Sequence, residues 1–348
     1  MTRRARSTVF SRSIQRTLKA LTRSAVRAGA KAVTQALRRG KPAARQRTPS
    51  KATIARPKVA AAVKLPNGFT VGVAGAQRYR LFVPPGARHA GRLPLLVMLH
   101  GCSQTTEAFA ASTRMNQIAA KEGFAVLYPE QNHLANLQGC WNWHQTRSGQ
   151  AQTEADAILA TILQVCQRQP VDPGRIALAG LSAGASMAAL LAVRHPARFC
   201  AVAMHSGIAP GVAHSLAGAL KAMRGHAVAA PLSPLPAGTH LPALLVIQGN
   251  TDPLVAPGNG LAAAQLWALR EAALPTRPRT QQRGARHPAT LTDYKTRGRL
   301  VATLCAIQGL GHAWSGGAAS QAYSDPKGPD ASRMIWAFAA KQFARVAA

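Results

Sequence analysis

Acidic residues are scarce in this chain of 348 residues, where 11 Asp and Glu stand against 43 Lys and Arg and the formal net charge is +32. No Asp or Glu precedes Glu107, whereas residues 1–64 contain 18 of the 43 basic residues. The excess charge therefore belongs mainly to the N-terminal segment, with a smaller share near residues 270–300. The total does not by itself indicate a core that binds nucleic acid.

Long hydrophobic runs are also missing. No stretch reaches the ~18 consecutive apolar residues that a membrane-spanning helix needs. The longest apolar run in the first 64 residues, 59–63, is shorter than the core of a signal peptide. We therefore expect no transmembrane segment and see no export signal. Five cysteines, a small and odd number, exclude a disulfide-rich scaffold but leave one bridge possible.

We predict that residues 1–64 form a basic, Arg/Ala-rich extension and that residues 65–348 form a catalytic domain. Within residues 8–28, apolar side chains recur at helical spacing and basic side chains occupy another face. Such an amphipathic helix suits an anionic or lipid-coated surface, for example that of a granule. The alternative is a solvated tail, and residues 38–58 are typical of a disordered linker. Nucleic acid is an unlikely partner because no aromatic residues are interleaved with the basic ones.

Beyond residue 65 the sequence alternates between strand and helix patterns. We predict strands at 69–73, 79–83, 93–99, 124–128, 175–179, 200–204, 243–248 and 300–308, and helices at 107–121, 154–168, 185–191, 260–273 and 331–346. This alternation predicts an α/β protein with a mostly parallel, doubly wound sheet and helices on both faces. We expect residues 210–240 to form a lid-like or cap-like insertion and residues 276–292 to form a long surface loop.

One pentapeptide stands between a predicted strand and a predicted helix: Gly180-Leu181-Ser182-Ala183-Gly184. A strand, the pattern Gly-x-Ser-x-Gly and a helix together form the context of a nucleophile elbow, in which the serine hydroxyl points out of the sheet. Glycines two residues before and two residues after the serine remove side chains that would collide in so tight a turn. The sequence therefore predicts Ser182 as a nucleophile.

An activated serine needs a base within hydrogen-bond reach and a carboxylate that orients this base. In α/β-hydrolases both follow the serine in the chain, each in a loop after a strand. Of the later acids, only Asp252 directly follows a strong strand. Of the two later histidines, His287 lies in the basic loop and His312 follows the strand at 300–308. We therefore predict the triad Ser182, Asp252 and His312; the acids set aside are Glu271, Asp293, Asp325 and Asp330.

The oxyanion of an acyl-transfer intermediate is expected to accept hydrogen bonds from two backbone N–H groups. One belongs to the residue after the nucleophile, Ala183, and the other to a loop that follows an earlier strand. The segment 99–104 occupies that place, and we predict the N–H of Cys102 as the second donor. His100, on the strand itself, is interpreted as a packing residue.

Several segments resemble the esterase family that contains short-chain poly(3-hydroxyalkanoate) depolymerases together with feruloyl and acetylxylan esterases. They are His100-Gly101-Cys102-Ser103-Gln104, Cys140-Trp141-Asn142-Trp143, Asp172-Pro173-Gly174-Arg175-Ile176, the Gly180–Gly184 pentapeptide, His205-Ser206-Gly207 and Gly311-His312-Ala313-Trp314-Ser315-Gly316-Gly317. The resemblance covers residues 68–346, and the ending Ser315-Gly316-Gly317 favours the polyester depolymerases. It implies an α/β-hydrolase fold, the same triad, and a disulfide between Cys102 and Cys140.

The predicted function is serine esterase activity through an acyl-enzyme on poly(3-hydroxybutyrate)-type polyesters or their oligomers, with no metal or cofactor. The alternatives are a feruloyl or acetylxylan esterase and, in another class, a non-catalytic protein that binds polyester granules or anionic surfaces. Trp314 is expected to contact substrate, while substrate contact and packing are both open for Trp141 and Trp143. The resemblance implies an extracellular enzyme; with no visible signal peptide, a cytoplasmic, granule-associated enzyme is the alternative. Cys166, Cys200 and Cys305 are interpreted as buried thiols.

Overall fold

The computed structural model describes residues 63–64, 68–86, 91–227, 230–232, 235–236 and 238–346. Apart from a two-residue strand, the predicted extension over residues 1–64 lies outside these ranges, and so does the amphipathic helix predicted within residues 8–28. Both stay predictions. In the described part of the chain, no helix combines the length and the apolar character needed to cross a membrane.

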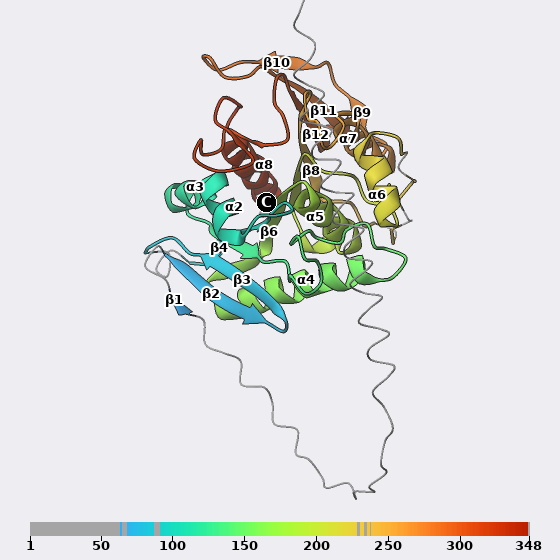
Figure 1. Ribbon diagram of the computed structural model, residues 1–348. Helices are drawn as coiled ribbons and strands as arrows, with labels where there is room; N and C mark the ends of the chain where they lie inside the picture. Colours follow the sequence, from blue (N-terminus) through green and yellow to red (C-terminus); the bar gives the residue numbers. More distant parts are fainter. Residues whose placement is uncertain are drawn as a thin grey trace, which may run out of the picture. The chain divides into compact units, whose positions relative to one another are not determined.

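A 12-stranded sheet forms the centre of the described structure (Figure 1). Its strand order is β1-β2-β3-β5-β4-β6-β7-β8-β12-β11-β10, and β9 pairs with β11 off this path. The six consecutive strands from β5 to β12 run parallel to their neighbours, while β2, β3 and β11 extend the sheet in antiparallel fashion. The predicted α/β fold with a mostly parallel sheet is confirmed.

The strands are β1 (Val63–Lys64), β2 (Phe69–Ala74), β3 (Gln77–Phe82), β4 (Leu93–Leu99), β5 (Ala125–Pro129), β6 (Val171–Leu181), β7 (Ala201–His205), β8 (Ala243–Gly249), β9 (Leu274–Pro275), β10 (Arg279–Gln281), β11 (Ala289–Thr296), β12 (Arg299–Ile307), β13 (Trp314–Ser315) and β14 (Ser324–Asp325). The helices are α2 (Thr106–Thr113), α3 (Met115–Glu122), α4 (Gln150–Arg168), α5 (Ala183–Arg194), the short 3₁₀ helix η2 (Pro196–Arg198), α6 (Leu216–Met223), α7 (Gly258–Arg270) and α8 (Ala331–Val346). β13 and β14 pair with each other in a separate two-stranded sheet.

Both faces of the central sheet are covered by helices. On β4, Leu95 and Val97 join the core beneath α4, α5 and α7, whereas Leu96 and Met98 join the core beneath α3 and α8. Figure 1 shows α2, α3 and α8 together on one side of the sheet. A strand that is buried on both faces must be apolar at successive positions, which explains the uninterrupted hydrophobic run of β4.

The helix predicted over residues 107–121 is two helices, α2 and α3. They are separated at Arg114, whose φ of 53° is left-handed and ends α2. The Arg114 guanidinium donates a hydrogen bond to the backbone carbonyl of Gly316. The break coincides with this contact to a distant loop, and no helix-breaking residue stands at this point. The local sequence therefore does not predict it.

The prediction of a long surface loop over residues 276–292 is wrong in part, because β10 lies within this range and β11 begins in it. β11 pairs antiparallel with β12, with Ala289 opposite Ile307. Only Ala289, Leu291 and Tyr294 of β11 are buried, and all of β10 is exposed. Strands with one or no buried face contain many polar residues, which gives them the composition of a loop. The expected insertion at 210–240 contains α6, and its role as a lid stays a prediction.

Leucines on α7 allow a matched test of the packing. Leu266 is 6% exposed and Leu269 is 73% exposed. We expect Leu266→Ala to lower the free energy of unfolding by about 2–5 kcal/mol, because it leaves a cavity in the core. Leu269→Ala is expected to change it by less than about 0.5 kcal/mol. Urea unfolding followed by circular dichroism measures both values, and equal losses would contradict the assigned orientation of α7.

Candidate active site

Ser182 occupies the turn between β6 and α5. Its backbone has φ 56° and ψ −121°, a conformation that residues with a side chain rarely adopt. The flanking glycines are required by space: a Cβ atom at Gly184 would lie 2.2 Å from the carbonyl oxygen of Leu99, and one at Gly180 would lie 2.4 Å from the carbonyl carbon of Gly184. Both positions of the Gly-x-Ser-x-Gly pattern that carry glycine therefore have no room for a side chain in this turn.

Two backbone bonds fix the serine turn. The N–H of Ser182 donates to the carbonyl of His205 at 2.9 Å, and the N–H of Ser186 donates to the carbonyl of Ser182 at 3.1 Å. Among the described residues, the Ser182 hydroxyl makes no hydrogen bond, so it is available to a substrate or a base. Hydrogen bonds between a nucleophile and its base are often long before substrate binds.

Asp252 follows β8, and its side chain has no exposed surface. Its Oδ1 accepts hydrogen bonds from the N–H groups of Leu254 and Val255 at 2.9 and 2.8 Å, and its Oδ2 lies 2.8 Å from Nδ1 of His312. Burial alone would raise the pKa of this carboxyl group. The hydrogen bond and charge of His312 and the two backbone donors outweigh burial, so the pKa of Asp252 lies below its ordinary value of 3.8.

His312 stands in the loop that follows β12, and its side chain is 8% exposed. Because a carboxylate can only accept, Nδ1 of His312 carries the proton that is donated to Asp252. In the neutral ring Nε2 is then unprotonated and can accept a proton. The strand order β6-β7-β8-β12 places the ends that precede Ser182, Asp252 and His312 at one edge of the sheet.

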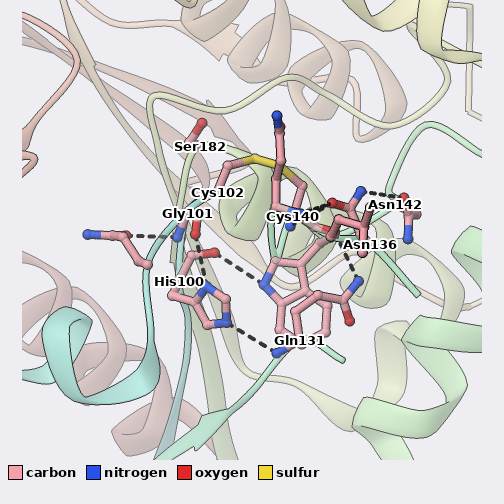
Figure 2. Close-up of a disulfide and its surroundings, with 12 residues drawn as sticks. His100, Gly101, Cys102, Gln131, Asn136, Cys140, Asn142 and Ser182 are labelled. Atoms are coloured by element: carbon pink, nitrogen blue, oxygen red, sulfur yellow. Dashed lines mark hydrogen bonds between the residues drawn. A yellow bond between two sulfur atoms is a disulfide. The ribbon is translucent and has the colours of Figure 1, made fainter. Parts of the chain in front are cut away.

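The loop after β4 lies directly beside the serine (Figure 2). A Cβ atom at Gly101 would lie 3.6 Å from Cβ of Ser182, and the N–H of Gly101 donates to Oε1 of Gln104 at 2.9 Å. Cys102 is bonded to Cys140 by a disulfide. Within the described residues, the backbone N–H groups of Cys102 and Ala183 have no hydrogen-bond acceptor, as an oxyanion hole requires.

The segment that carries Cys140 is fastened to the loop after β4. The indole N–H of Trp141 donates to the carbonyl of His100 at 3.1 Å. Nδ1 of His100 lies 2.9 Å from the carbonyl oxygen of Gly101, and its Nε2 accepts from the N–H of Gln131 at 3.2 Å (Figure 2). Burial lowers the pKa of His100 to about 4, so this ring is neutral, and its two hydrogen bonds connect the loop after β4 to the segment at Gln131. Between the disulfide partners, Leu134 is 94% exposed at the tip of the loop.

Burial decides against substrate contact for two of the tryptophans, which was expected for Trp314 and left open for Trp141. Trp141 and Trp314 are both 0% exposed, which leaves no surface for an acyl chain. The indole N–H of Trp314 donates to the Ser332 hydroxyl at 3.0 Å, and its ring packs edge-on against Phe109. Both tryptophans therefore pack beneath the candidate site. Trp143 is 8% exposed, and its contact with substrate stays a prediction.

The remaining cysteines are free thiols, and they differ in burial. Cys166 and Cys305 are buried, whereas Cys200 is half-buried. The expectation of three buried thiols holds for the first two only, because Cys200 stands just before β7 at the amino end of the strand. Burial raises the pKa of Cys305 to about 12, which keeps this thiol protonated and unreactive.

Sequence reasoning assigned no role to His205, which is 0% exposed at the carboxyl end of β7. A histidine that ends a central parallel strand, at the edge where ligands bind, is the signal that could have pointed to it. Elsewhere in the described structure, a cleft of about 910 Å³ between α3, α8 and residues 281–287 contains none of the predicted catalytic residues.

Comparison with known proteins agrees with this architecture. Poly(3-hydroxyalkanoate) depolymerase C from Paucimonas lemoignei is 35% identical over 115 residues, 33% of this chain and 28% of that protein. Feruloyl esterase B from Thermothelomyces thermophilus is 30% identical over 120 residues, 34% of this chain and 41% of that protein. The chain thus spans less than half the length of these two relatives. The solved acetyl xylan esterase from Aspergillus awamori shares the fold, with a TM-score of 0.54 at 18% identity over 68% of this chain and 89% of that chain.

The sheet, the strained serine turn and the Asp–His pair at the carboxyl edge define an α/β-hydrolase. Residues 77–270 match the model of a family described as esterase PHB depolymerase. This match covers more than half of the chain, which therefore belongs to that family. The resemblance seen in the sequence motifs is confirmed.

The glycine of the serine turn gives a direct test of the packing at the site. We expect Gly184→Ala to abolish esterase activity and to lower the urea midpoint, because the new methyl group would overlap the carbonyl of Leu99. Gly258→Ala is the matched control, since no atom lies within 4 Å of its Cβ position. Normal activity in Gly184→Ala would show that the turn has a different geometry.

Buried neutral histidines predict a pH dependence of stability. Burial lowers the pKa of His100 to about 4 and that of His205 to about 3. Below pH 6.5 these histidines bind protons in the unfolded chain but not in the folded protein, so the free energy of unfolding falls as pH decreases toward 4. By pH 4.5 the loss is roughly 2–3 kcal/mol per histidine.

Urea unfolding at pH 7 and pH 4.5 measures this loss. His100→Gln removes one of these titrating groups, so its free energy of unfolding is expected to fall less between the two pH values than that of the wild type. Equal slopes in the variant and the wild type would show that His100 is already protonated in the folded protein.

Proposed function

We propose that this protein is a serine ester hydrolase in which Ser182 is the nucleophile, His312 the general base and Asp252 the residue that orients the base. The observation that carries the proposal is the 2.8 Å contact between Oδ2 of Asp252 and Nδ1 of His312, at the sheet edge where the strained Ser182 turn also stands. Family membership supports the same chemistry.

The reaction has two steps. In the first, Ser182 Oγ attacks the ester carbonyl while Nε2 of His312 takes the hydroxyl proton, and the same proton then passes to the departing alkoxide. In the second, His312 deprotonates a water molecule that attacks the acyl-enzyme, and the proton returns to Ser182 Oγ as the acid leaves. Asp252, held by two backbone N–H groups, stays ionised and stabilises the imidazolium.

The oxyanion of each tetrahedral intermediate accepts hydrogen bonds from the N–H groups of Cys102 and Ala183. Ala183 begins α5, so the positive end of the helix dipole adds to its donor strength. In comparable sites one donor is worth about 3–4 kcal/mol of transition-state stabilisation. The disulfide and the Trp141 bond to His100 hold the Cys102 loop ready before substrate arrives.

The proposed substrates are polyesters of the poly(3-hydroxybutyrate) type and their oligomers. The 35% identity to a poly(3-hydroxyalkanoate) depolymerase over 115 residues supports this choice. The similarity to feruloyl esterase B supports an aryl ester as the second candidate. Residues 8–28 are proposed to bind a granule or another anionic surface, on the grounds of charge and periodicity alone.

An oxidising compartment is the proposed location, and the Cys102–Cys140 disulfide supports it. Disulfides form and persist outside the cytosol, where thiols are not kept reduced. A cytoplasmic enzyme attached to polyester granules is the alternative. Thiol labelling of the protein freshly isolated from its cells distinguishes the two, because only a cytoplasmic enzyme would expose all five cysteines to the reagent after denaturation.

The function is tested by release of 3-hydroxybutyrate from amorphous poly(3-hydroxybutyrate), with p-nitrophenyl butyrate and methyl ferulate as parallel substrates. We expect the wild type to cleave the polymer and the butyrate, and we expect Ser182→Ala to lower kcat by about 10³-fold or more, because the covalent route is lost.

Asp252→Asn is expected to lower kcat by up to about 10⁴-fold, because an amide stabilises the wrong tautomer of His312. Asp293→Asn is the matched control, because it removes a carboxylate from β11, which supplies no proposed catalytic residue. This variant should retain activity. If the wild type hydrolyses methyl ferulate alone, the proposed triad stands and the proposed polyester substrate is wrong. Equal rates for Ser182→Ala and wild type would refute the catalytic proposal and favour a surface-binding protein.

A further inference from the structure

β7 supplies none of the proposed catalytic residues, yet it lies in the sheet between β6, which precedes Ser182, and β8, which precedes Asp252. β7 pairs with β6 on one side and with β8 on the other, with His205 opposite Leu181 and Ile247. Ser182 directly follows Leu181, and Asp252 stands in the turn after β8. The mechanism proposed above assigns no task to His205 or to its neighbour Ser206.

The main chain at this point bonds to two catalytic segments. The carbonyl of His205 accepts the N–H of Ser182 at 2.9 Å. The next peptide turns in the other direction: the N–H of Ser206 donates to the carbonyl of Ile247 at 2.9 Å, and Ser206 has a left-handed φ of 53°. Consecutive residues thus connect the nucleophile turn to the strand that leads to Asp252.

The side chain of His205 bonds to the third catalytic segment. Its Nε2 accepts the backbone N–H of Ser315 at 3.1 Å. Its ring stacks on Trp314, with ring centroids 5.1 Å apart and an interplanar angle of 23°. Both partners form β13, which follows His312 by one residue, so the ring packs against the segment that carries His312.

The bond to Ser315 requires a neutral imidazole, because Nε2 can accept only when it has no proton. Nδ1 then carries the proton and donates to the Ser206 hydroxyl at 3.1 Å. Burial, as the larger cause, and the nearby His312 together lower the pKa of His205 to about 3, against the opposing effect of Asp252. The ring therefore stays an acceptor over the whole range in which an esterase works.

We infer that His205 is a positioning residue, which sets the distance between Ser182 and His312 by bonding to the nucleophile turn through its carbonyl and to the histidine loop through its ring. The inference rests on the proposed triad. No other residue type offers both properties at this position: a flat ring of this size to stack on Trp314 and an acceptor that reaches the Ser315 N–H.

Two substitutions separate the two properties of the ring. His205→Phe keeps a flat ring and removes the acceptor, which leaves the Ser315 N–H buried without a partner. His205→Gln keeps an acceptor close to the position of Nε2 and removes the ring. Both leave the backbone carbonyl that holds Ser182. Phe124→Leu is the control for a general loss of packing, because Phe124 is 0% exposed and stacks on Trp336, away from the catalytic loops.

The experiment measures kcat and KM on p-nitrophenyl butyrate, with the concentration of competent sites determined by titration of Ser182 with a phosphonate ester. We expect kcat per titrated site to fall by at least about 10-fold in His205→Phe, since displacement of a catalytic group by ~1 Å costs on the order of 10²-fold. KM is expected to change less than about threefold. His205→Gln should recover part of the loss, and Phe124→Leu should keep the wild-type kcat.

A wild-type kcat per site in His205→Phe would overturn the inference and leave His205 as a packing residue. So would an equal fall of kcat in Phe124→Leu. If His205→Phe does not fold, His205→Leu makes the same comparison with a smaller side chain. Failure of the proposed function is a distinct result, in which the wild type neither turns over the ester nor reacts at Ser182, and it removes the inference as well.

Discussion

The site depends on how closely the backbone of α5 approaches the end of β4. A single methyl group at Gly184 would overlap the carbonyl of Leu99, so these two elements meet without an intervening side chain. This contact holds Ser182 in its left-handed conformation and brings the loop of Cys102 beside it. A second contact of the same kind lies at Gly249, where a Cβ atom would be 2.1 Å from the carbonyl of Leu310, two residues before His312. Backbone packing therefore fixes the geometry before any side chain takes part.

Two buried histidines support the loops of the site as neutral hydrogen-bond acceptors. His100 and His205 are buried imidazoles that use their unprotonated nitrogens as acceptors for backbone N–H groups, one below the loop of Cys102 and the other below the loop of His312. Because burial holds both pKa values at about 4 or below, neither ring carries charge at neutral pH. Neither ring therefore adds a positive charge near Asp252, and the ionised carboxylate of Asp252 is the charge that acts on His312 from within the protein.

Much of this arrangement could be predicted from the sequence, because parallel strands that are buried on both faces read as apolar runs and their ends carry glycine, aspartate or histidine. Asp252 and His312 could be chosen by position alone, and they lie within hydrogen-bond distance. The break at Arg114 could not be predicted, since it accompanies a bond to a loop 202 residues away. The burial of Trp314 and the contacts of His205 depend likewise on side chains that meet only after folding, and no local pattern encodes them.

The disulfide has a further consequence for how this protein can be modified. Cys102 and Cys140 are 38 residues apart, and the highly exposed Leu134 lies in the loop between β5 and Cys140. A peptide inserted at Leu134 would enter an exposed loop whose later end is held to Cys102 by the disulfide. Exposed loop tips also tolerate insertion best. This loop is thus a suitable attachment point for an added module, such as a label or a binding peptide, that leaves the disulfide in place.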